Sequence, residues 1–505
     1  MPGHPKAVLA LDLGSTTSRA ALFAFDSTRV ATAALPSQLT SPERGRAEHD
    51  PEAWWRALRE LVGRLLDEGA SREVELSGLA ISAFTRTQVF LGGDGAPVRP
   101  AITWRDGRAG AEAARLAAAI EAEGLGEALG TTNPPNAFHP LARVLWVKAH
   151  EPARLARTRW VLSPKDYLNY RLTGVAAGDL PQGALVLDPR TLELPRPLFA
   201  RLELDPALIP PMFWPETPLG PVRAGLPPPL DRLAGIPVFT GSLDAWCCTL
   251  GIGAMRAGAA YVASGTSDIL GILHPRRVTA AGLTALRWTE ALWHLGGVVQ
   301  TGGDCLAWLA ALLGEPAGRV MERLAGQARP ASVPLFLPYL AGERTPLWDP
   351  DVRAGFLGVD RRHSALHLAW AVLEGVAFAD RHGLELAFAA SGSDPAEVRL
   401  TGGAARFDAW CQARADVLGR TIVRTREPEA GLLGAAMVAL RGLGEFRDWD
   451  EAQARLVRVE RRFEPDLSRA DRYARLFAVY KDFSAWSVDP SRRLAEAQSP
   501  CPRDA

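Results

Sequence analysis

The sequence predicts an α/β protein of two large domains, each built around one phosphate-binding hairpin. At 505 residues the chain exceeds the length at which a single hydrophobic core keeps growing. Residues 8–25 place two apolar runs around a Gly-Ser-Thr-Thr turn, and residues 259–273 repeat this pattern around Gly-Thr-Ser about half a chain later. We therefore divide the chain into a first domain of residues 1–241 and a second domain of residues 242–505.

The first turn carries the residue types expected of an anion site. Asp12 ends the first predicted strand, and the turn Gly14-Ser15-Thr16 follows it. Glycine permits a sharp turn in which N–H groups and hydroxyls converge on one anion, and an ionised carboxylate beside them suits Mg²⁺. A single turn of this kind is more often an ordinary β-hairpin. The second copy at residues 265–267 favours a phosphate and magnesium cradle.

Composition places the chain among ordinary globular proteins and excludes several classes of partner. It is 47% hydrophobic and 23% charged, and its 57 basic residues balance 57 acidic ones. This balance provides no overall field for nucleic acid or an anionic membrane. No apolar run reaches the roughly 18 residues of a membrane-spanning helix, and the first six residues do not make a signal peptide. We expect a cytoplasmic protein.

Cysteine and histidine positions do not indicate a structural metal. The cysteines are odd in number and lack C-x-x-C spacing, which indicates reduced thiols packed as small hydrophobic side chains. They are Cys247, Cys248, Cys305, Cys411 and Cys501. His363 and His367 are four residues apart on a predicted helix, but without a third ligand nearby they indicate a solvated helix face.

Polar residues after a predicted strand mark a candidate ligand site in the first half. Residues 74–82 have the pattern of a strand, and Thr85 and Arg86 follow its carboxyl end, where ligands bind in α/β sheets. Trp104 and Asp106 lie in a loop with two arginines. An aromatic ring beside fixed charges can hold a polyhydroxyl ligand by its apolar face and its hydroxyls. A surface loop with a packed tryptophan is the alternative.

Asp244 lies between the two halves, after a short predicted strand and directly before a predicted helix. An acid in this position is suited to act as a general base, and a helix cap is the alternative role. The ten prolines between residues 206 and 237 predict an extended connection without regular elements near a domain boundary.

Glycines in the second half predict close approach of backbone to a flat or anionic ligand. A strand, Gly402-Gly403 and a helix follow one another, and Gly434 lies where another helix opens. The chain contains neither a P-loop nor a G-x-G-x-x-G pattern after a strand. Nucleotide binding would therefore use the duplicated hairpins.

The ordered motifs resemble those of the FGGY carbohydrate kinases over nearly the whole chain. They include ALDLGSTTSRA, PAITWRDGRA, PKDYLNYRLTG, TGSLDAWCCTLGIGA, ASGTS, FLPYLAGERTP, RLTGGAARFDAW and AGLLGAA. The resemblance implies two ribonuclease-H-like domains of the actin and sugar-kinase superfamily, with a catalytic cleft between them. It also implies ATP and Mg²⁺ as cofactors, a small-molecule sugar as substrate, sugar binding by the first domain and nucleotide binding by the second.

The same resemblance assigns roles to single residues. Asp244 matches the catalytic base, and Asp12 matches a residue that helps to hold Mg²⁺. The expected nucleotide-binding residues are Gly14, Ser15, Thr16, Arg19, Gly265, Thr266, Gly302, Gly402, Gly403, Ala404 and Gly434. The expected substrate-binding residues are Thr85, Arg86, Trp104, Asp106 and Asp244.

Within the family, the xylulokinases look most similar, through ITWRDGR, LSPKDYLNYRLTG and LPYLAGERTP. The expected substrate is a pentulose such as D-xylulose, phosphorylated on a primary hydroxyl in xylose metabolism. One departure is Phe84-Thr85-Arg86-Thr87, which stands where typical xylulokinases carry Gln-Met-His-Gly. Its arginine offers a forked donor to a hydroxyl or a carboxylate. Another ketose, a polyol of the glycerol or erythritol type, or a sugar acid is the alternative substrate.

Two other classes of function are weighed against the kinase. An actin-like or chaperone-like ATPase would share the fold and the hairpins, but it would need polymer or peptide surfaces and would release phosphate without a sugar. A sugar-sensing regulator would need a DNA-binding module, and no basic helix-turn-helix segment precedes residue 8. We expect no nucleic-acid or membrane partner, and a homodimer is one candidate assembly.

Overall fold

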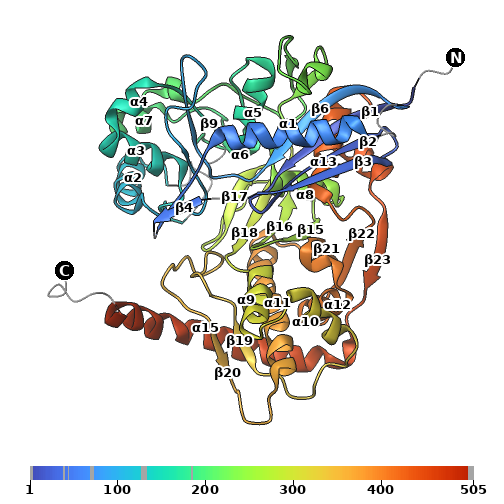
Figure 1. The fold of residues 1–505 in the computed structure, drawn as a ribbon. Coiled ribbons are helices and arrows are strands. Elements are labelled where there is room, and N and C mark those ends of the chain that lie inside the picture. The colour runs from blue at the N-terminus through green and yellow to red at the C-terminus, as the bar shows by residue number, and fades with distance from the viewer. Residues whose placement is uncertain are drawn as a thin grey trace. The chain divides into compact units, whose positions relative to one another are not determined.

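The structure is a computed structural model, which describes residues 4–37, 40–43, 45–68, 73–126, 133–183 and 186–498. The chain divides into two compact units, whose elements are labelled in Figure 1. The first unit comprises Met1–Met255, Leu286–Leu292 and Glu429–Val457. The second comprises Arg256–Ala285, Trp293–Pro428 and Arg458–Ala505. The chain therefore returns to the first unit twice after it has entered the second.

A seven-stranded sheet forms the centre of the first unit. Its strands follow the order β12-β13-β6-β1-β2-β3, and β14 also pairs with β6. In the register, Asp12 lies opposite Arg19 of β2 and Ser82 of β6, and Ser242 of β14 lies opposite Ser82. The carboxyl ends of three strands thus meet at one edge. The bounds are β1 Lys6–Leu13, β2 Thr17–Ala24, β3 Arg29–Pro36, β6 Glu75–Ala83, β12 Pro218–Pro221, β13 Pro237–Phe239 and β14 Ser242–Leu243.

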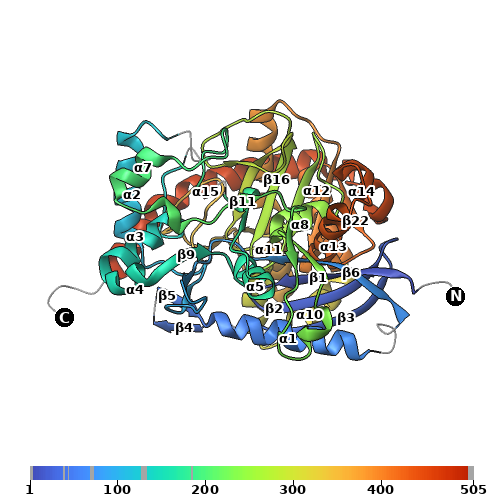
Figure 2. The same ribbon diagram turned by 90° about the horizontal axis from the view of Figure 1, so that it is seen from above.

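Different helices cover the two faces of this sheet, as Figure 2 shows for α1 on one side and α8 and α13 on the other. Leu9, Leu11 and Leu13 of β1 share a hydrophobic cluster with the buried side chains of α1 (Pro51–Asp67). Because successive strand residues point to opposite faces, Asp12 points to the other face. There β1 contacts α13 (Ala430–Gly442), and β6 contacts both α13 and α8 (Asp244–Gly251).

Glycines allow α8 and α13 to pack in close contact. A Cβ atom on Gly434 would lie 2.0 Å from the Cys247 carbonyl oxygen, and one on Gly251 would lie 2.0 Å from that of Ala430. Any side chain at these positions would collide with backbone. This packing explains why residues 429–457 group with the first unit. Each unit is assembled from several separate segments of the chain, so the units do not test a single boundary along the sequence. The domain boundary after residue 241 stays a prediction.

The rest of the first unit surrounds this centre. Helix α1 begins after Asp50, whose side chain accepts a hydrogen bond from the Glu52 N–H and so caps the helix. The other elements are α2 Gly110–Ala122, α3 Pro140–His150, α4 Pro152–Arg157, α5 Pro164–Thr173, α6 Leu180–Gly183, α7 Arg196–Leu202, α14 Trp449–Leu456, β4 Thr40–Glu43, β5 Arg46–His49, β7 Val89–Gly92, β8 Ala101–Ile102, β9 Thr158–Leu162, β10 Gly178–Asp179 and β11 Met212–Phe213.

A second seven-stranded sheet, in the order β17-β18-β16-β15-β21-β22-β23, forms the centre of the second unit. It repeats the central pattern of the first sheet, because the antiparallel hairpin β15–β16 lies beside the parallel strand β21. Its elements are β15 Ala260–Ser264, β16 Asp268–His274, β17 Thr284–Arg287, β18 Trp293–Val299, β21 Glu397–Gly402, β22 Thr421–Thr425, β23 Val459–Phe463, β19 Leu335–Leu337, β20 Gly355–Leu357, α9 Gly303–Leu312, α10 Ala317–Ala325, α11 Ala365–Ser391, α12 Asp408–Leu418 and α15 Ala470–Gln498.

Both predicted hairpins and the α/β class with two domains are confirmed. The prediction that the proline-rich stretch has no regular elements is wrong in part, because the stretch contains the strand β12, which pairs with β13. Proline lacks an N–H group, but it is tolerated on an edge strand such as this one. Four cysteines are free thiols, and Cys501 lies outside the described residues. Within the described ranges, no helix combines the length and apolar character needed to cross a bilayer.

Candidate active site

Asp12 is a half-buried carboxylate at the end of β1, held close to the start of α13. A Cβ atom on Gly431 would lie 3.3 Å from Asp12 Oδ2 and 3.5 Å from Cys248 Sγ, so the glycine leaves room beside the carboxylate. Burial raises the pKa of Asp12 to about 6, although the Arg19 guanidinium and the Ser82 hydroxyl act in the opposite direction. Arg19 itself pairs with Glu429 at 3.3 Å.

Asp244 is the first residue of α8, directly after β14. Its Oδ1 accepts a hydrogen bond of 2.8 Å from the neighbouring Ala245 N–H. A helix cap would instead accept from an N–H two or three residues further on, which disfavours the alternative of a simple cap. Burial raises the pKa of Asp244 to about 7, and the Asp12 carboxylate adds to this rise. The two acids therefore face a common space in the first unit.

A buried polar network fixes the segment that leads to Asp244. Ser242 donates a hydrogen bond of 2.8 Å to Asp179, which forms an ion pair of 2.7 Å with Lys165. The Asn169 amide donates to the Thr240 carbonyl at 2.9 Å. Gly241 has a φ of 69°, and a Cβ atom there would lie 2.0 Å from a β6 carbonyl oxygen. Asp244 therefore extends from a rigid support, which suits a catalytic group.

The predicted phosphate turn of the first unit lies next to Asp12. Gly14 has no room for a side chain, since a Cβ atom would lie 2.3 Å from the Thr17 carbonyl oxygen. Ser15 is half-buried and Thr16 is exposed. The sharp turn and the accessible hydroxyls match what an anion site requires.

Three chain segments bring most of the predicted nucleotide-binding residues together in the second unit. Gly302 donates from its N–H to the Thr266 carbonyl at 2.8 Å, and Gly303 donates to that of Gly265 at 2.9 Å. Gly402 lies opposite Ser264 in the register of β21 and β15, with a φ of 91°. The exposed Gly403 and the buried Ala404 follow it at the end of β21. Gly434, by contrast, is buried in the first unit between α13 and α8, a packing role that the sequence did not predict.

A charged triad that the sequence did not predict lies beneath the second hairpin. Arg414 of α12 pairs with Asp268 at 2.5 Å and with Asp380 of α11 at 2.9 Å, and all three side chains are fully buried. The Ser264 hydroxyl donates to Asp268 at 2.7 Å. This network ties the hairpin to two helices. Three residues so far apart in sequence give no spacing signal.

Four of the five predicted substrate-binding residues, all except Asp244, come together through Arg143 of α3, which sequence reasoning missed. Its guanidinium donates to the carbonyl oxygen of Arg86 and, at 2.9 Å, to that of Asp106. The Thr87 hydroxyl accepts a bond of 3.1 Å from the Trp104 N–H. The loop after β6 and the loop after β8 therefore form one cluster that contains Thr85, Arg86, Trp104 and Asp106.

Within this cluster, Asp106 is already occupied by protein donors. Its carboxylate is fully buried and accepts hydrogen bonds from the Ala47 N–H at 2.7 Å and from Arg108 Nε and Nη2 at 2.8 and 2.6 Å. Trp104 is half-buried, with the Arg105 guanidinium 5.0 Å from its ring centroid. In this structure Asp106 shapes the loop that presents Trp104.

The donor set around Asp12 fits a magnesium ion that is shared with a nucleotide. No group of three or more His, Cys, Asp or Glu side chains suited to a metal occurs among the described residues. Mg²⁺ is commonly held by one or two carboxylates together with substrate phosphates. A carboxylate whose pKa burial has raised, beside a glycine that leaves open space, meets that requirement.

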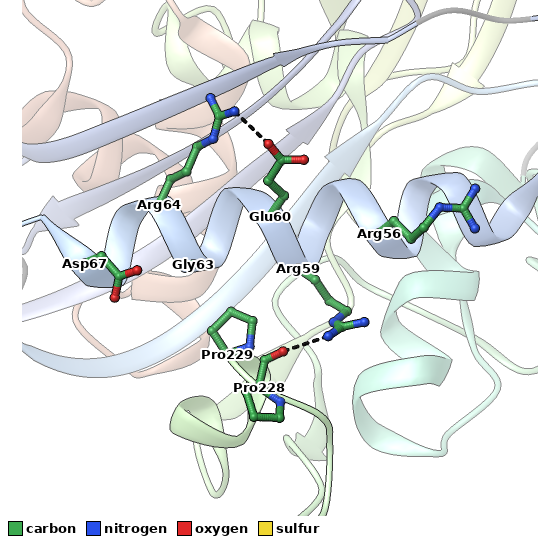
Figure 3. Close-up of a pocket in the computed structure, with 8 residues that line it drawn as sticks. All are labelled: Arg56, Arg59, Glu60, Gly63, Arg64, Asp67, Pro228 and Pro229. Atoms are coloured by element: carbon green, nitrogen blue, oxygen red, sulfur yellow. Dashed lines mark hydrogen bonds and ion pairs between the residues drawn. The ribbon is translucent and has the colours of Figure 1, made fainter.

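A separate surface hollow of 560 Å³ lies along α1 and is drawn in Figure 3. Arg64 pairs there with Glu60 at 2.6 Å, and Arg59 donates to the Pro228 carbonyl at 2.8 Å. None of the predicted site residues lines it. Its other two charged side chains also have partners, since Arg56 pairs with Asp50 and Asp67 pairs with Arg232, so the hollow is not a second candidate for the active site.

Comparison with known proteins matches nearly the whole chain. The N-terminal domain model of the FGGY family of carbohydrate kinases matches residues 7–251, and the C-terminal domain model matches residues 260–443. A xylulose kinase of Escherichia coli is 30% identical over 85% of this chain and 89% of its own length. A gluconokinase of Bacillus licheniformis is 26% identical, with 97% and 98% covered. A crystal structure from Brucella ovis, titled a xyloylose kinase, superimposes with a TM-score of 0.86 at 27% identity, with 94% and 98% covered.

Proposed function

The chain belongs to the FGGY family of carbohydrate kinases, and from this premise we propose that it transfers a phosphoryl group from ATP to a sugar hydroxyl with Asp244 as general base. The observation that carries the proposal is the pair of carboxylates, Asp12 at the end of β1 and Asp244 directly after β14, because both strands pair in parallel with β6. Asp12 is suited to help bind a cation, and Asp244 is suited to accept a proton. Phosphoryl transfer to a hydroxyl requires both.

Asp244 acts by accepting the proton of the attacking hydroxyl. Oδ1 is oriented by the Ala245 N–H, so Oδ2 is the oxygen that receives the proton as the sugar oxygen bonds to the γ-phosphorus and ADP leaves. A pKa near 7 suits a base that must be ionised before the reaction and protonated during it. Mg²⁺, held with the help of Asp12, would neutralise the charge of the phosphates.

The glycine-rich turns provide the nucleotide side of the proposal. Gly14, Ser15, Thr16 and Arg19 would meet phosphate oxygens in the first unit, and Gly265, Thr266 and Gly302 would do so in the second. Gly402, Gly403 and Ala404 are proposed on the adenosine side, whereas Gly434 is buried between α13 and α8 and serves their packing. Because ATP is a cytoplasmic metabolite, we place the reaction in the cytoplasm.

Two observations favour different substrates within this function. Relatives named xylulose kinases support a pentulose such as D-xylulose, phosphorylated on a primary hydroxyl in xylose metabolism. The relatives named gluconokinases, together with the unpaired guanidinium of Arg86, support a sugar acid. Another ketose or a polyol remains a weaker alternative. All of these carry the primary hydroxyl that Asp244 would deprotonate.

The direct test measures ADP release from MgATP with a panel of ketoses, aldoses, polyols and sugar acids. The expected result is ADP release that depends on one substrate class, together with a phosphorylated product in mass spectrometry. Steady phosphate release without any sugar would instead support an actin-like ATPase and would overturn the proposal.

A further inference from the structure

Arg86 is an arginine without a counter-ion at the carboxyl end of β6. Its side chain is half-buried, yet its guanidinium has no hydrogen bond or ion pair in the described part of the chain. Its backbone has a φ of 53°, a region that residues other than glycine rarely occupy. Two other arginines with little exposure have carboxylate partners: Arg99 pairs with Glu48 and Glu151, and Arg329 pairs with Glu374. A sheltered cation with no partner indicates a missing anion.

The groups around Arg86 add positive charge rather than neutralise it. Arg143 is fully buried, and Arg86 and Arg143 lie close enough for each to weaken the protonation of His139. Burial and these two guanidinium groups lower the pKa of His139 to about 3, so its ring is neutral and its Nδ1 accepts the Leu141 N–H. The cluster therefore offers two cations and a neutral imidazole.

The acids of the neighbourhood are bound elsewhere. Asp106 lies nearest to Arg143, but both of its oxygens accept hydrogen bonds from Arg108. Glu48 pairs with Arg99 and Arg108 at 2.7 Å each. No described carboxylate is in contact with Arg86. The protein itself does not balance the charge at this position.

Hydrogen-bond donors are also in excess in the cluster. Three buried polar atoms have no partner in the described structure: the Thr85 hydroxyl, the Trp104 indole nitrogen and Arg143 Nε. Two of these groups can only donate, and the hydroxyl can donate as well. A native protein rarely leaves several buried donors unpaired in one place. Their natural complement is a ligand rich in oxygen acceptors.

From this combination we propose that Arg86, supported by Arg143 and His139, forms a carboxylate-binding subsite, so that the substrate of this kinase is a sugar acid. The inference rests on the proposed kinase function and specifies its substrate. Ser82 of the same strand lies opposite Asp12 and Ser242 in the sheet, so the subsite and the proposed base share one sheet edge. An aldonate carries a carboxylate at one end for Arg86 and a primary hydroxyl at the other for Asp244.

The test compares substrates that differ only in the charged end. Initial rates with MgATP give kcat/KM for D-gluconate, its uncharged amide D-gluconamide and its alditol D-glucitol. D-xylonate, xylitol, D-erythronate, erythritol and D-xylulose complete the series. We expect at least one aldonate to exceed its alditol and its amide by about 100-fold, because a charge-assisted pair is lost in both neutral analogues.

The Arg86→Gln variant separates substrate recognition from structure. It keeps a hydrogen-bond donor and removes the charge, so kcat/KM for the preferred aldonate should fall about tenfold to hundredfold. The kcat/KM values for the alditols should stay within threefold of those of the unaltered protein, and the melting temperature should not fall. Arg64→Gln, which changes an exposed arginine of α1, is the matched control and should leave all substrates unaffected.

Two results would overturn the subsite without affecting the kinase assignment. One is a preference for D-xylulose or an alditol over every aldonate. The other is a uniform loss across all substrates in Arg86→Gln with a lower melting temperature, which would make Arg86 scaffolding. If no substrate is phosphorylated, the kinase proposal fails, and calorimetric titration of D-gluconate, D-xylonate and D-erythronate into both proteins decides the subsite. Binding that is lost in Arg86→Gln supports it, and absence of binding to the unaltered protein overturns it.

Discussion

The two hairpins of the molecule have similar turns but use the neighbouring acid differently. In the first unit Asp12 is the penultimate residue of β1, its pKa is raised to about 6, and the arginine opposite it in the sheet pairs with Glu429. In the second unit Asp268 begins β16, is fully buried and pairs with Arg414 at 2.5 Å. One acid is left available to a ligand, and the other is consumed by the scaffold. A repeated fold can thus assign chemistry to one copy and stability to the other.

This difference predicts that variants near the first hairpin lose activity, whereas variants near the second lose stability.

The largest effect should come from Asp244→Asn, which keeps the size of the side chain and removes the proton acceptor. We expect kcat to fall by about 10² to 10⁴ with little change in melting temperature. Steady-state kinetics and calorimetry measure the two quantities. Asp408→Asn is a matched control, because Asp408 is also the first residue of a helix but pairs with surface arginines. Activity of Asp244→Asn within threefold of the unaltered protein would contradict the base assignment.

The next largest effect concerns the triad of the second unit. Arg414→Met removes the only cation bonded to Asp268 and Asp380 among the described residues, leaving two buried carboxylates uncompensated. Breaking a buried ion pair in this way costs about 3–5 kcal/mol of unfolding free energy, measured by denaturant titration. Arg19→Met is the corresponding change at the first hairpin. It should cost less than about 1 kcal/mol, because Arg19 keeps 30% of its side chain exposed. Equal losses in the two variants would remove the distinction between the hairpins.

A smaller effect is expected from Asp12→Asn. Loss of the carboxylate that would help to hold Mg²⁺ should lower kcat about tenfold to hundredfold and raise the Mg²⁺ concentration required for half-maximal rate. The melting temperature of the nucleotide-free protein should rise, since a poorly solvated charge disappears. Asp268→Asn should have the opposite pattern, with a lower melting temperature and an unchanged Mg²⁺ requirement. An unaltered metal dependence in Asp12→Asn would exclude Asp12 from the metal site.

Much of this arrangement was predictable, because it depends on local signals. Gly14 and Gly265 lie in the turns between segments with the alternating pattern of strands, which predicts the two hairpins. Asp12 and Asp244 are acids that follow such segments, so both candidate acids could be predicted from a few neighbouring residues. The α/β class followed from the same alternation. Such signals use the period of the strand and the conformational freedom of glycine, which act within a few residues.

The parts that could not be predicted depend on contacts between distant segments. Arg143 connects the loops of Arg86 and Asp106, yet it looks like any other residue of a buried helix. Gly434 was expected beside a nucleotide, but its lack of a side chain is already required by the contact with Cys247. The partners of Arg414 lie on three different elements. Tertiary packing decides which of these side chains pair, and contacts between distant segments produce no regular residue spacing that could be recognised in the sequence.

Glu343 provides the most specific test, because it is a buried acid without the ion pair that Asp268 has. It is 3% exposed, its Oε1 accepts the N–H groups of Gln300 and Arg344 at 2.7 and 2.8 Å, and its Oε2 has no partner in the described structure. Burial raises its pKa from 4.5 to about 8. Between these values the folded protein keeps a proton that the unfolded chain releases, so this contribution to stability is fully present below pH 4.5 and is lost as the pH rises to about 8.

Glu343→Gln imitates the protonated acid and removes this dependence. The free energy of unfolding of the unaltered protein should therefore fall relative to the variant by about 1.4 kcal/mol for each pH unit between pH 5 and 8. Denaturant titrations of both proteins at pH 5, 6.5 and 8 measure the difference. Glu385→Gln, at an exposed acid of α11 paired with Arg381, should run parallel to the unaltered protein and serves as the control. If Glu343→Gln also runs parallel, Glu343 is ionised in the folded state, and a cation must compensate it as Arg414 compensates Asp268.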